Sequence, residues 1–334
     1  MIKKISLLLF LIVNVKADPI FKHAYVSISD LEHNRYFDNQ IKKIAHKVTY
    51  NKDGKYISQD NNENFLSKYD VIVLGTHDKL KACPNAKIKT KIIGTLSIAT
   101  EHLNDIKQNH PEIYTVNSPT GNTISTAEHT FALMIALSKQ LLERNLIDRR
   151  SSGLKGENLG TTELAGKTLG LVGFGNIARQ VYKRAKAFDM KIISHTAHPE
   201  KYKSYSYVEF MPLEDVIKKC DILSLHVPEN EQTSNLIDAQ KLSTCKPGML
   251  LINASRQGLV NHEDFKELLE IGKIGGLGLD YDHPDYDFKN FKNVWITPHI
   301  AGVTKESKLK MGNELVNNII EVSKQLERNQ NDSK

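Results

Sequence analysis

Short apolar runs alternate with helical patterns over the first third of the chain. From about Phe21 to Val116, these runs are separated by longer stretches in which apolar positions recur at helical spacing. Such alternation is typical of a parallel β-sheet covered by helices. The sequence predicts strands here at Ala24–Ile28, Val71–Leu74 and Ile92–Thr95.

Two longer stretches predict helices outside that region. Apolar residues keep helical spacing from about Thr123 to Arg149, and arginines gather at the end of the stretch, where cations suit a helix C-terminus. The pattern predicts one continuous helix there. A final amphipathic helix is predicted over Lys308–Leu326.

The region between these helices has the most regular pattern. A strand, a glycine turn and a helix are followed by further apolar runs with helical stretches between them. This predicts a doubly wound α/β unit of about six strands, the size of a dinucleotide-binding fold. The expected strands are Leu169–Val172, Lys191–Ser194, Ile222–His226, Met249–Asn253, Leu277–Asp280 and Val294–Ile296.

Composition narrows the class of protein. The 334 residues are 40% hydrophobic and 25% charged, as in a globular protein with room for two domains. The net charge of +6 comes from scattered lysines, so nothing favours a nucleic-acid partner. The cysteines, Cys83, Cys220 and Cys245, are far apart and lack CxxC spacing, which argues against a disulfide framework and a metal site.

The turn after the Leu169–Val172 strand has the form GxGxxA. Gly173 allows a tight turn, Gly175 lets a phosphate approach the backbone, and Ala178 permits close packing of helix on strand. The helix N-terminus that begins at Asn176 and Ile177 offers unpaired N–H groups to an anion. The turn therefore predicts a site for NAD or NADP, with a glycine turn that binds nothing as the alternative.

The residues after the expected strand Lys191–Ser194 do not decide between NAD and NADP. NAD-binding proteins place an acid there, but this chain has His195 and Thr196, with His198, Lys201 and Lys203 close by. Without an acid, a 2′-phosphate is not repelled, so NAD and NADP both stay open. A variable loop with solvent-facing histidines is the alternative.

Several motifs, taken in order, resemble those of the D-isomer-specific 2-hydroxyacid dehydrogenase family. The resemblance runs from about Ile92 to Gly302, and more weakly on either side. Leu164–Phe188 is similar to the cofactor signature of that family. Leu225–Pro228 with Thr233 resembles its LHVPLTxxT segment, Leu251–Val260 its LINxxRGxxV segment, Gly278–Asp280 its GLDV segment, Asn293–Gly302 its NVxxTPHIAG segment, and Glu128–Thr130 its AEH segment.

The resemblance implies a role for each matching residue. Arg256 would bind the substrate carboxylate and polarise the carbonyl, and His299 would act as general acid in reduction and as base in oxidation. Asp280 would help to place the nicotinamide amide. Further cofactor contacts are implied at His226, Val227, Pro228, Thr233 and Ala254, and carboxylate contacts through the backbone at Ser97, Ile98 and Ala99.

One departure from the family pattern concerns the partner of His299. The family has a glutamate before a proline shortly after the GLDV segment, and that carboxylate raises the pKa of the histidine. Here the segment is shorter and His283 precedes Pro284. Asp282 is the nearest replacement, with Asp285 behind it.

The resemblance also implies an architecture and an activity. The fold would be α/β with two doubly wound domains: a Rossmann-type coenzyme domain at 119–302 and a discontinuous flavodoxin-like substrate domain at 20–118 with 303–330. The protein would be a homodimer. It would transfer a hydride between NAD(P)H and a small 2-keto acid bound in the cleft between the domains. The alternative is a catalytically weak dinucleotide-binding sensor on the same fold.

The first seventeen residues carry a separate signal. Lys3 and Lys4 precede the apolar run Ile5–Val13, and Ala17 stands where a signal peptidase would cut. The run is too short for a stable membrane span. A buried first strand is the alternative. Export conflicts with a soluble, mainly intracellular nicotinamide cofactor, so cytoplasmic and exported locations both stay open.

Overall fold

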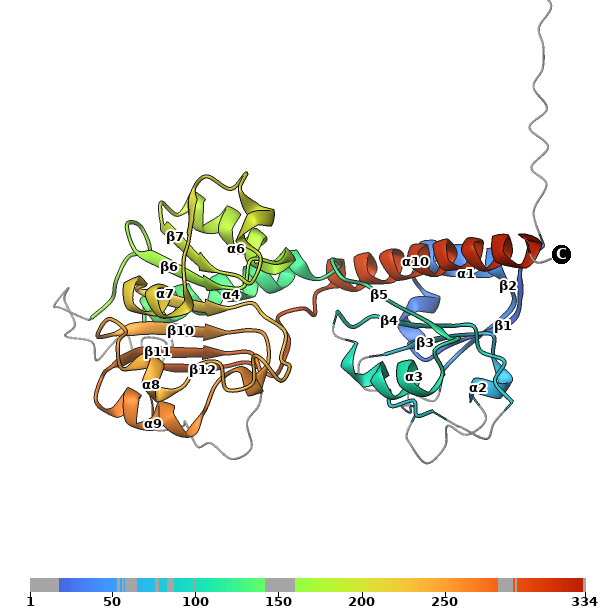
Figure 1. Cartoon of the computed structure of the whole chain (residues 1–334), viewed down its shortest axis with the longest axis horizontal. Coiled ribbons are helices and arrows are strands. Elements are labelled where there is room, and N and C mark those ends of the chain that lie inside the picture. Colours follow the sequence, from blue (N-terminus) through green and yellow to red (C-terminus); the bar gives the residue numbers. More distant parts are fainter. Residues whose placement is uncertain are drawn as a thin grey trace, which may run out of the picture. The chain divides into compact units, whose positions relative to one another are not determined.

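The chain folds into two compact units (Figure 1). Unit 1 comprises residues 1–118 and 312–334, and unit 2 comprises residues 119–311. The computed structural model describes residues 18–52, 55, 57, 65–75, 78–82, 87–98, 100–141, 160–281, 291 and 293–332. The segment 1–17, for which a secretory signal was expected, lies outside the described residues.

Unit 1 contains a parallel sheet with the strand order β2-β1-β3-β4-β5, which is the flavodoxin-like order. Helices α1 and α10 share one hydrophobic core with it, and α2 and α3 share another. The sheet is therefore covered on both faces. The elements are β1 (Phe21–Val26), η1 (Ser29–Glu32), α1 (Arg35–Ile44), β2 (Ala45–Tyr50), α2 (Phe65–Lys68), β3 (Val71–Leu74), β4 (Ile92–Thr95), η2 (Glu101–Leu103), α3 (Asn104–Asn109), β5 (Tyr114–Asn117) and α10 (Lys305–Asp332), whose first turns belong to unit 2.

The three strands predicted in this region are confirmed as β1, β3 and β4, but two further strands were missed. Both β2 and β5 lie at the edges of the sheet. β2 exposes His46 and Lys47, and β5 has no fully buried residue. An edge strand packs against fewer neighbours, so its sequence does not need the continuous apolar run that revealed the central strands.

Unit 2 contains a seven-stranded parallel sheet with the order β12-β11-β10-β9-β6-β7-β8. Counted from β6, this is the Rossmann order with one strand added, which confirms the predicted coenzyme-domain fold. The elements are α4 (Thr123–Ser138), β6 (Thr168–Val172), α6 (Asn176–Ala187), β7 (Lys191–His195), η3 (Pro199–Tyr202), β8 (Val208–Phe210), α7 (Leu213–Lys219), β9 (Ile222–Leu225), α8 (Ala239–Leu242), β10 (Met249–Asn253), η4 (Gln257–Leu259), α9 (Glu263–Glu270), β11 (Ile274–Leu279) and β12 (Val294–Ile296).

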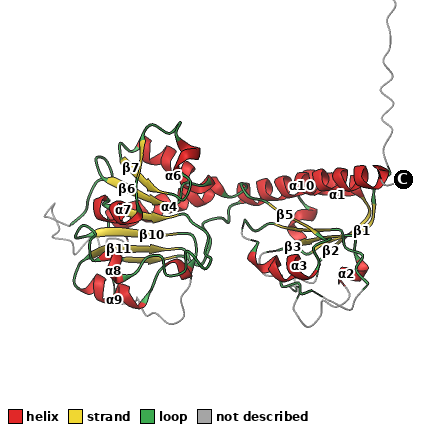
Figure 2. Cartoon of the chain, in the orientation of Figure 1, coloured by secondary structure: helices red, strands yellow, loops and turns green. Residues whose placement is uncertain are grey.

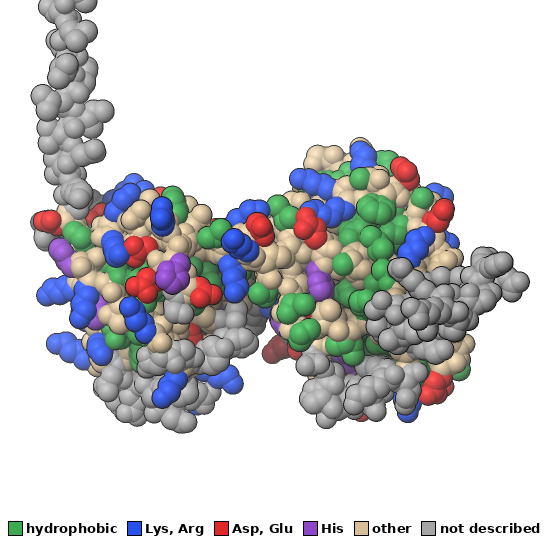
Figure 3. Space-filling model, turned by 180° about the vertical axis from the view of Figure 1, so that it is seen from behind, with side chains coloured by type: hydrophobic (Ala, Val, Ile, Leu, Met, Phe, Trp, Pro, Cys, Tyr) green, Lys and Arg blue, Asp and Glu red, His purple; other side chains and the backbone are tan. Residues whose placement is uncertain are grey.

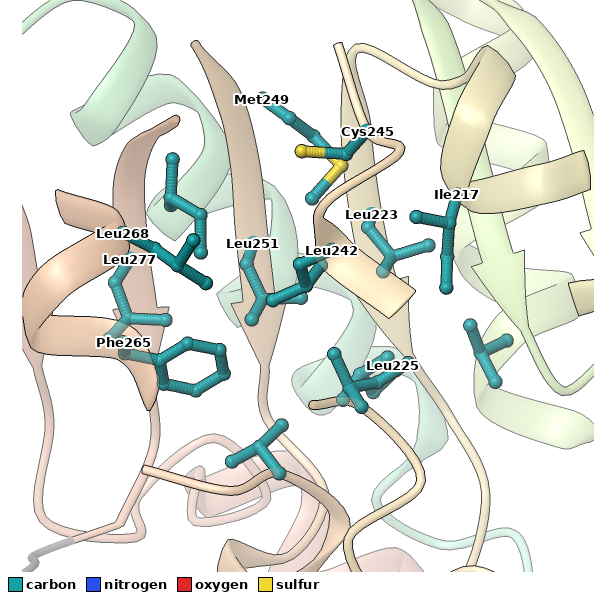
Figure 4. Close-up of a cluster of buried hydrophobic side chains, with 14 of the residues drawn as sticks. Ile217, Leu223, Leu225, Leu242, Cys245, Met249, Leu251, Phe265, Leu268 and Leu277 are labelled. Carbon is teal, nitrogen blue, oxygen red and sulfur yellow. The ribbon is translucent and has the colours of Figure 1, made fainter. Parts of the chain in front are cut away.

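Helices cover both faces of this sheet (Figure 2). Helices α7, α8 and α9 pack on one face, where Leu223 and Leu251 contribute to a core that also contains Cys245 and Met249 (Figure 4). Helices α4 and α6 pack on the other face, against Ile222 and Ile252. Adjacent strand residues thus enter opposite cores, which is why these strands read as uninterrupted apolar runs.

The prediction of one continuous helix over Thr123–Arg149 is wrong in its extent. α4 ends at Ser138, and the chain turns at Lys139 and Gln140, where Gln140 adopts a left-handed backbone with φ of 51°. A left-handed residue interrupts helical hydrogen bonding although the apolar spacing continues. The predicted stretch from 142 onward lies outside the described residues. The final helix is longer than predicted at both ends.

The surface of both units carries charges of both signs. On the face drawn in Figure 3, Lys and Arg side chains are spread over the two units with Asp and Glu among them. Several of them pair, such as Lys42 with Asp38 at 2.7 Å and Lys246 with Asp221 at 2.8 Å. Within the described part of the chain, no helix is both long and apolar enough to cross a membrane.

We predict that the two cysteines of unit 2 do not react in the folded protein. Burial raises the pKa of the Cys220 thiol to about 12 and also raises that of Cys245. In a Cys83→Ser variant at about pH 8, an aromatic disulfide reagent should label neither thiol until guanidinium unfolds the chain. Rapid labelling of either thiol before unfolding would contradict the burial of this core.

Candidate active site

The candidate residues of unit 2 follow neighbouring strands at one edge of the sheet. Gly173 follows β6, His226 follows β9, Arg256 lies just beyond β10, Asp280 follows β11, and His299 lies beyond β12. The sheet order places these strands side by side, and the carboxyl ends of parallel strands share one edge. Ligands of open α/β sheets bind at that edge, next to the point where the strand order reverses.

The glycine turn lies at this reversal, between β6 and β9. Gly173 has φ of +90°, and a Cβ there would lie 2.6 Å from the carbonyl oxygen of His226, so only glycine fits. A Cβ on Gly175 would meet no atom within 4 Å. α6 begins at the next residue without a side-chain cap. The turn thus leaves open backbone at a helix N-terminus, which suits a pyrophosphate.

The backbone of His226 lies against this turn, and its imidazole is neutral. Its Nε2 lies 2.9 Å from Ser224 Oγ, while its Nδ1 is buried and has no hydrogen-bond partner among the described residues. Burial lowers the pKa of His226 to about 4. An unpaired buried nitrogen is unfavourable. A bound cofactor, or water, would provide the missing partner, so this atom and the glycine turn both fit the nicotinamide cofactor.

Among the residues that the structure describes, none places a carboxylate for a ribose at the end of β7. The ring nitrogen Nδ1 of His195 lies 3.3 Å from the carbonyl oxygen of Met211, and Thr196 is half-buried. The acid that follows in the chain, Glu200, lies 3.3 Å from His198. The guanidinium carbon of Arg179 lies 5.8 Å from the ring centre of Tyr202, the last residue of η3. The surroundings are therefore basic and aromatic.

A buried network fixes the backbone at Arg256. Asn253, at the end of β10, donates from Nδ2 to the Arg256 carbonyl at 2.8 Å and to the Tyr281 hydroxyl at 2.9 Å. Its Oδ1 accepts from the Ser255 amide at 3.0 Å. Burial raises the pKa of Tyr281 above its ordinary value, so the phenol stays neutral. The motif analysis missed Asn253 and Tyr281, although Tyr281 stands where the GLDV motif has valine.

A second network fixes the turn that carries His299. Asp280 is only 2% exposed, and its Oδ1 accepts from the Thr297 hydroxyl at 2.6 Å and from the Ile300 amide at 2.8 Å. Its Oδ2 accepts from the Ala301 amide at 2.8 Å. His299 itself is exposed and left-handed, with φ of 55°. The expected contact of Asp280 with a nicotinamide amide stays a prediction.

The remaining predicted residues fall in three places. The Thr233 hydroxyl donates to the Pro228 carbonyl at 2.6 Å and closes the loop after β9, while Val227 packs against Gly173 and Ala254 is half-buried after β10. In unit 1, the loop after β4 is held by the Ser97 amide donating to Thr95 Oγ1 at 3.2 Å and by Asn117 donating to the Ile98 carbonyl at 2.7 Å. Ala99, Asp282 and Asp285 lie outside the described residues.

Comparison with known proteins agrees with this geometry. A family model described as the NAD-binding domain of D-isomer specific 2-hydroxyacid dehydrogenases matches residues 131–301. The hydroxypyruvate reductase of Thermotoga maritima is 31% identical over 297 residues, which cover 85% of this chain and 96% of that protein. A solved acyclic imino acid reductase, in complex with NADPH and D-Arg, aligns with a TM-score of 0.79 at 26% identity over 91% of this chain and 97% of that one.

Some relatives are considerably longer than this chain. The D-3-phosphoglycerate dehydrogenase of Archaeoglobus fulgidus is 30% identical over 268 residues, which cover 78% of this chain but 51% of that protein. The chain thus spans about half the length of the phosphoglycerate dehydrogenases it matches, and nearly all of the hydroxypyruvate reductase.

We predict that His226 makes the protein less stable in acid. Its pKa falls from 6.5 when exposed to about 4 in the fold, so between these values the unfolded chain binds a proton that the folded chain does not. The free energy of unfolding should therefore fall as the pH drops through this window, by roughly 3 kcal/mol at most. Urea unfolding of the wild type and of His226→Gln at several pH values measures the difference.

The variant should show a shallower loss of stability with acid than the wild type, because glutamine does not titrate. A His198→Gln variant provides the control, since His198 is exposed. Equal slopes for the wild type and His226→Gln would show that the His226 ring is not held neutral.

Proposed function

Because the chain belongs to the D-isomer specific 2-hydroxyacid dehydrogenase family, we propose that it transfers a hydride between NAD(P)H and a small 2-keto acid. The observation that carries this proposal is the succession of Gly173, Arg256 and His299 along one edge of the unit 2 sheet. A protein that only binds a dinucleotide needs the glycine turn but neither the guanidinium nor the imidazole.

The cofactor would be held at the glycine turn and along the strand ends beside it. The open backbone at Gly175 and the uncapped start of α6 would receive the pyrophosphate. His226 Nδ1 is the buried polar atom in need of a partner there. When bound, the nicotinamide ring supplies the hydride in reduction and accepts it in oxidation.

Arg256 would bind and orient the carboxylate of the keto acid. One guanidinium nitrogen, Nη1, donates to the Ser255 carbonyl at 2.8 Å, which leaves further N–H groups for a bidentate pair with a carboxylate. The Asn253 and Tyr281 network holds the backbone from which this side chain extends. A fixed carboxylate keeps the keto carbon aligned for hydride attack, which lowers the entropic part of the barrier.

His299 would move the proton that accompanies the hydride. As the hydride adds to the keto carbon, the carbonyl oxygen gains an electron pair and takes a proton from the imidazolium, giving the hydroxyl group. In the reverse direction the neutral imidazole takes that proton back. Imidazole suits both steps because it titrates near neutral pH. Asp282 or Asp285 would be the carboxylate that stabilises the imidazolium.

The substrate class is proposed from the names of the relatives, and the assembly from exposed apolar side chains on one helix. The names of the matched enzymes, hydroxypyruvate reductase and glyoxylate reductase, suggest short 2-keto acids. The substrate carboxylate would also contact the backbone at Ser97–Ala99. We further propose a homodimer formed through α4, which exposes Ile124 and packs Phe131 against the exposed Phe188 at the end of α6.

We predict that the chain binds NADPH at least as tightly as NADH, because no carboxylate at the end of β7 repels a 2′-phosphate. Introducing one with Thr196→Asp should weaken NADPH binding about tenfold and leave NADH within about twofold. Fluorescence titration of both cofactors into the wild type and the variant measures this. Equal weakening of both cofactors would mean that Thr196 does not face the 2′ position.

We predict that His299→Ala lowers kcat by about a hundredfold or more, because the proton donor is lost. Cofactor affinity should stay unchanged. Turnover is followed by loss of NAD(P)H absorbance with glyoxylate, hydroxypyruvate and pyruvate, and His33→Ala, at an exposed position in unit 1, is the control. Full turnover by His299→Ala would remove this residue from the mechanism.

A further inference from the structure

Helix α4 contacts the turn that carries His299 at two points, and the residue before the helix lies close to the end of the turn. His129 Nε2 lies 2.8 Å from Thr297 Oγ1, at the start of the turn. Ser125 Oγ, one helical turn earlier, donates to the Ala301 carbonyl at 2.6 Å, at its end. These two side chains lie on one face of the helix because they are four residues apart. Asn122 Nδ2, which precedes the helix, would lie 2.6 Å from a Cβ on Gly302.

The direction of the hydrogen bonds follows from the chemistry of the groups. The Thr297 hydroxyl has one proton, and its shortest contact is the Asp280 carboxylate oxygen at 2.6 Å, which can only accept. The hydroxyl oxygen is then the acceptor toward His129, so His129 Nε2 carries a proton. The bonds run from His129 to Thr297 to Asp280, and His129 Nε2 also lies 3.6 Å from Asp280 Oδ1.

These contacts add to the backbone hydrogen bonds of the turn, in which the Thr297 amide donates to the Leu279 carbonyl at 2.9 Å and the His299 amide to the Thr297 carbonyl at 2.9 Å. Pro298, His299 and Ile300 are all exposed. The left-handed backbone of His299 is a strained conformation for a residue with a side chain, and it persists only where the surroundings impose it. Asp280 supplies the buried acceptor, and α4 supplies the support behind Thr297.

We propose that His129 is a positioning residue, which acts through Thr297 and Asp280 to hold the turn in the conformation that presents His299. This rests on the proposed function for its effect on turnover, but not for its effect on the turn. Because His129 touches neither substrate nor cofactor in this role, its loss changes the placement of the general acid and leaves cofactor binding intact.

The first test compares two substitutions at His129. His129→Leu removes the donor, whereas His129→Gln can place an N–H group where Nε2 lies. We expect His129→Leu to lower kcat about tenfold, with cofactor Kd unchanged, because small displacements of a catalytic group are costly. His129→Gln should restore most of the activity. Glu128→Gln, on the exposed side of the same helix turn, is the matched control and should behave as the wild type.

The second test needs no turnover. Hydrogen exchange of peptides covering 297–303 reports the Ile300 and Ala301 amides, which both donate to Asp280. We expect exchange about tenfold faster in His129→Leu and near wild-type rates in His129→Gln. Thr297→Val should speed exchange at least as much as His129→Leu, because it also removes the hydroxyl that donates to Asp280, and it tests the same link if the leucine variant does not fold. The double variant should exchange no faster than Thr297→Val alone.

The outcomes separate this inference from the proposed function. Absence of turnover by the wild type with every keto acid overturns the proposed function, while the exchange experiment still decides the role of His129. Wild-type exchange and kcat in His129→Leu overturn the positioning role. Equal damage from glutamine and leucine, or additive effects of His129→Leu and Thr297→Val, also overturns it.

Discussion

The buried carboxylate of Asp280 is the interaction on which the geometry of the candidate site depends. A buried charge is tolerated only when hydrogen-bond donors surround it, and here the donors on Thr297, Ile300 and Ala301 all come from one short turn. The amides of Ile300 and Ala301 both find their acceptor in this one carboxylate. Carboxylate and turn therefore order each other, and His299, which lies between the donors Thr297 and Ile300, has a left-handed backbone that is unfavourable for a residue with a side chain.

The strand order of the doubly wound sheet brings this interaction next to the residues that support Arg256. β10, β11 and β12 are neighbours, so the Asn253 network beneath Arg256 and the Asp280 network beneath His299 lie on adjacent strand ends. Tyr281 follows Asp280 directly, and its hydroxyl oxygen accepts a hydrogen bond from Asn253 Nδ2, which links the two networks across the sheet. Arg256 and His299 are thus supported from one edge of the sheet, two strands or more from the glycine turn at the reversal of strand order.

Sequence reasoning succeeded where burial alone determines the residue. The central strands are buried on both faces and read as apolar runs, and Gly173 is fixed by a turn that leaves no room for a Cβ. It failed for β2, β5 and β8, which lie at sheet edges or are very short, and for the end of α4, where Gln140 turns although the apolar spacing continues. The supporting residues were also missed, because a hydrogen bond between His129 and Thr297 joins positions far apart in the chain and leaves no periodic pattern.

The proposed hydride transfer to a keto carbon at this edge of the sheet is tested most directly by following deuterium from the reduced cofactor to the substrate. The protein would be incubated with nicotinamide cofactor deuterated at C4 of the reduced ring and with a short 2-keto acid, and the product examined by mass spectrometry and chiral chromatography. Hydride transfer at this site should give a 2-hydroxy acid of D configuration with a single deuterium on C2. Tight cofactor binding with the deuterium retained and every keto acid unchanged would contradict it.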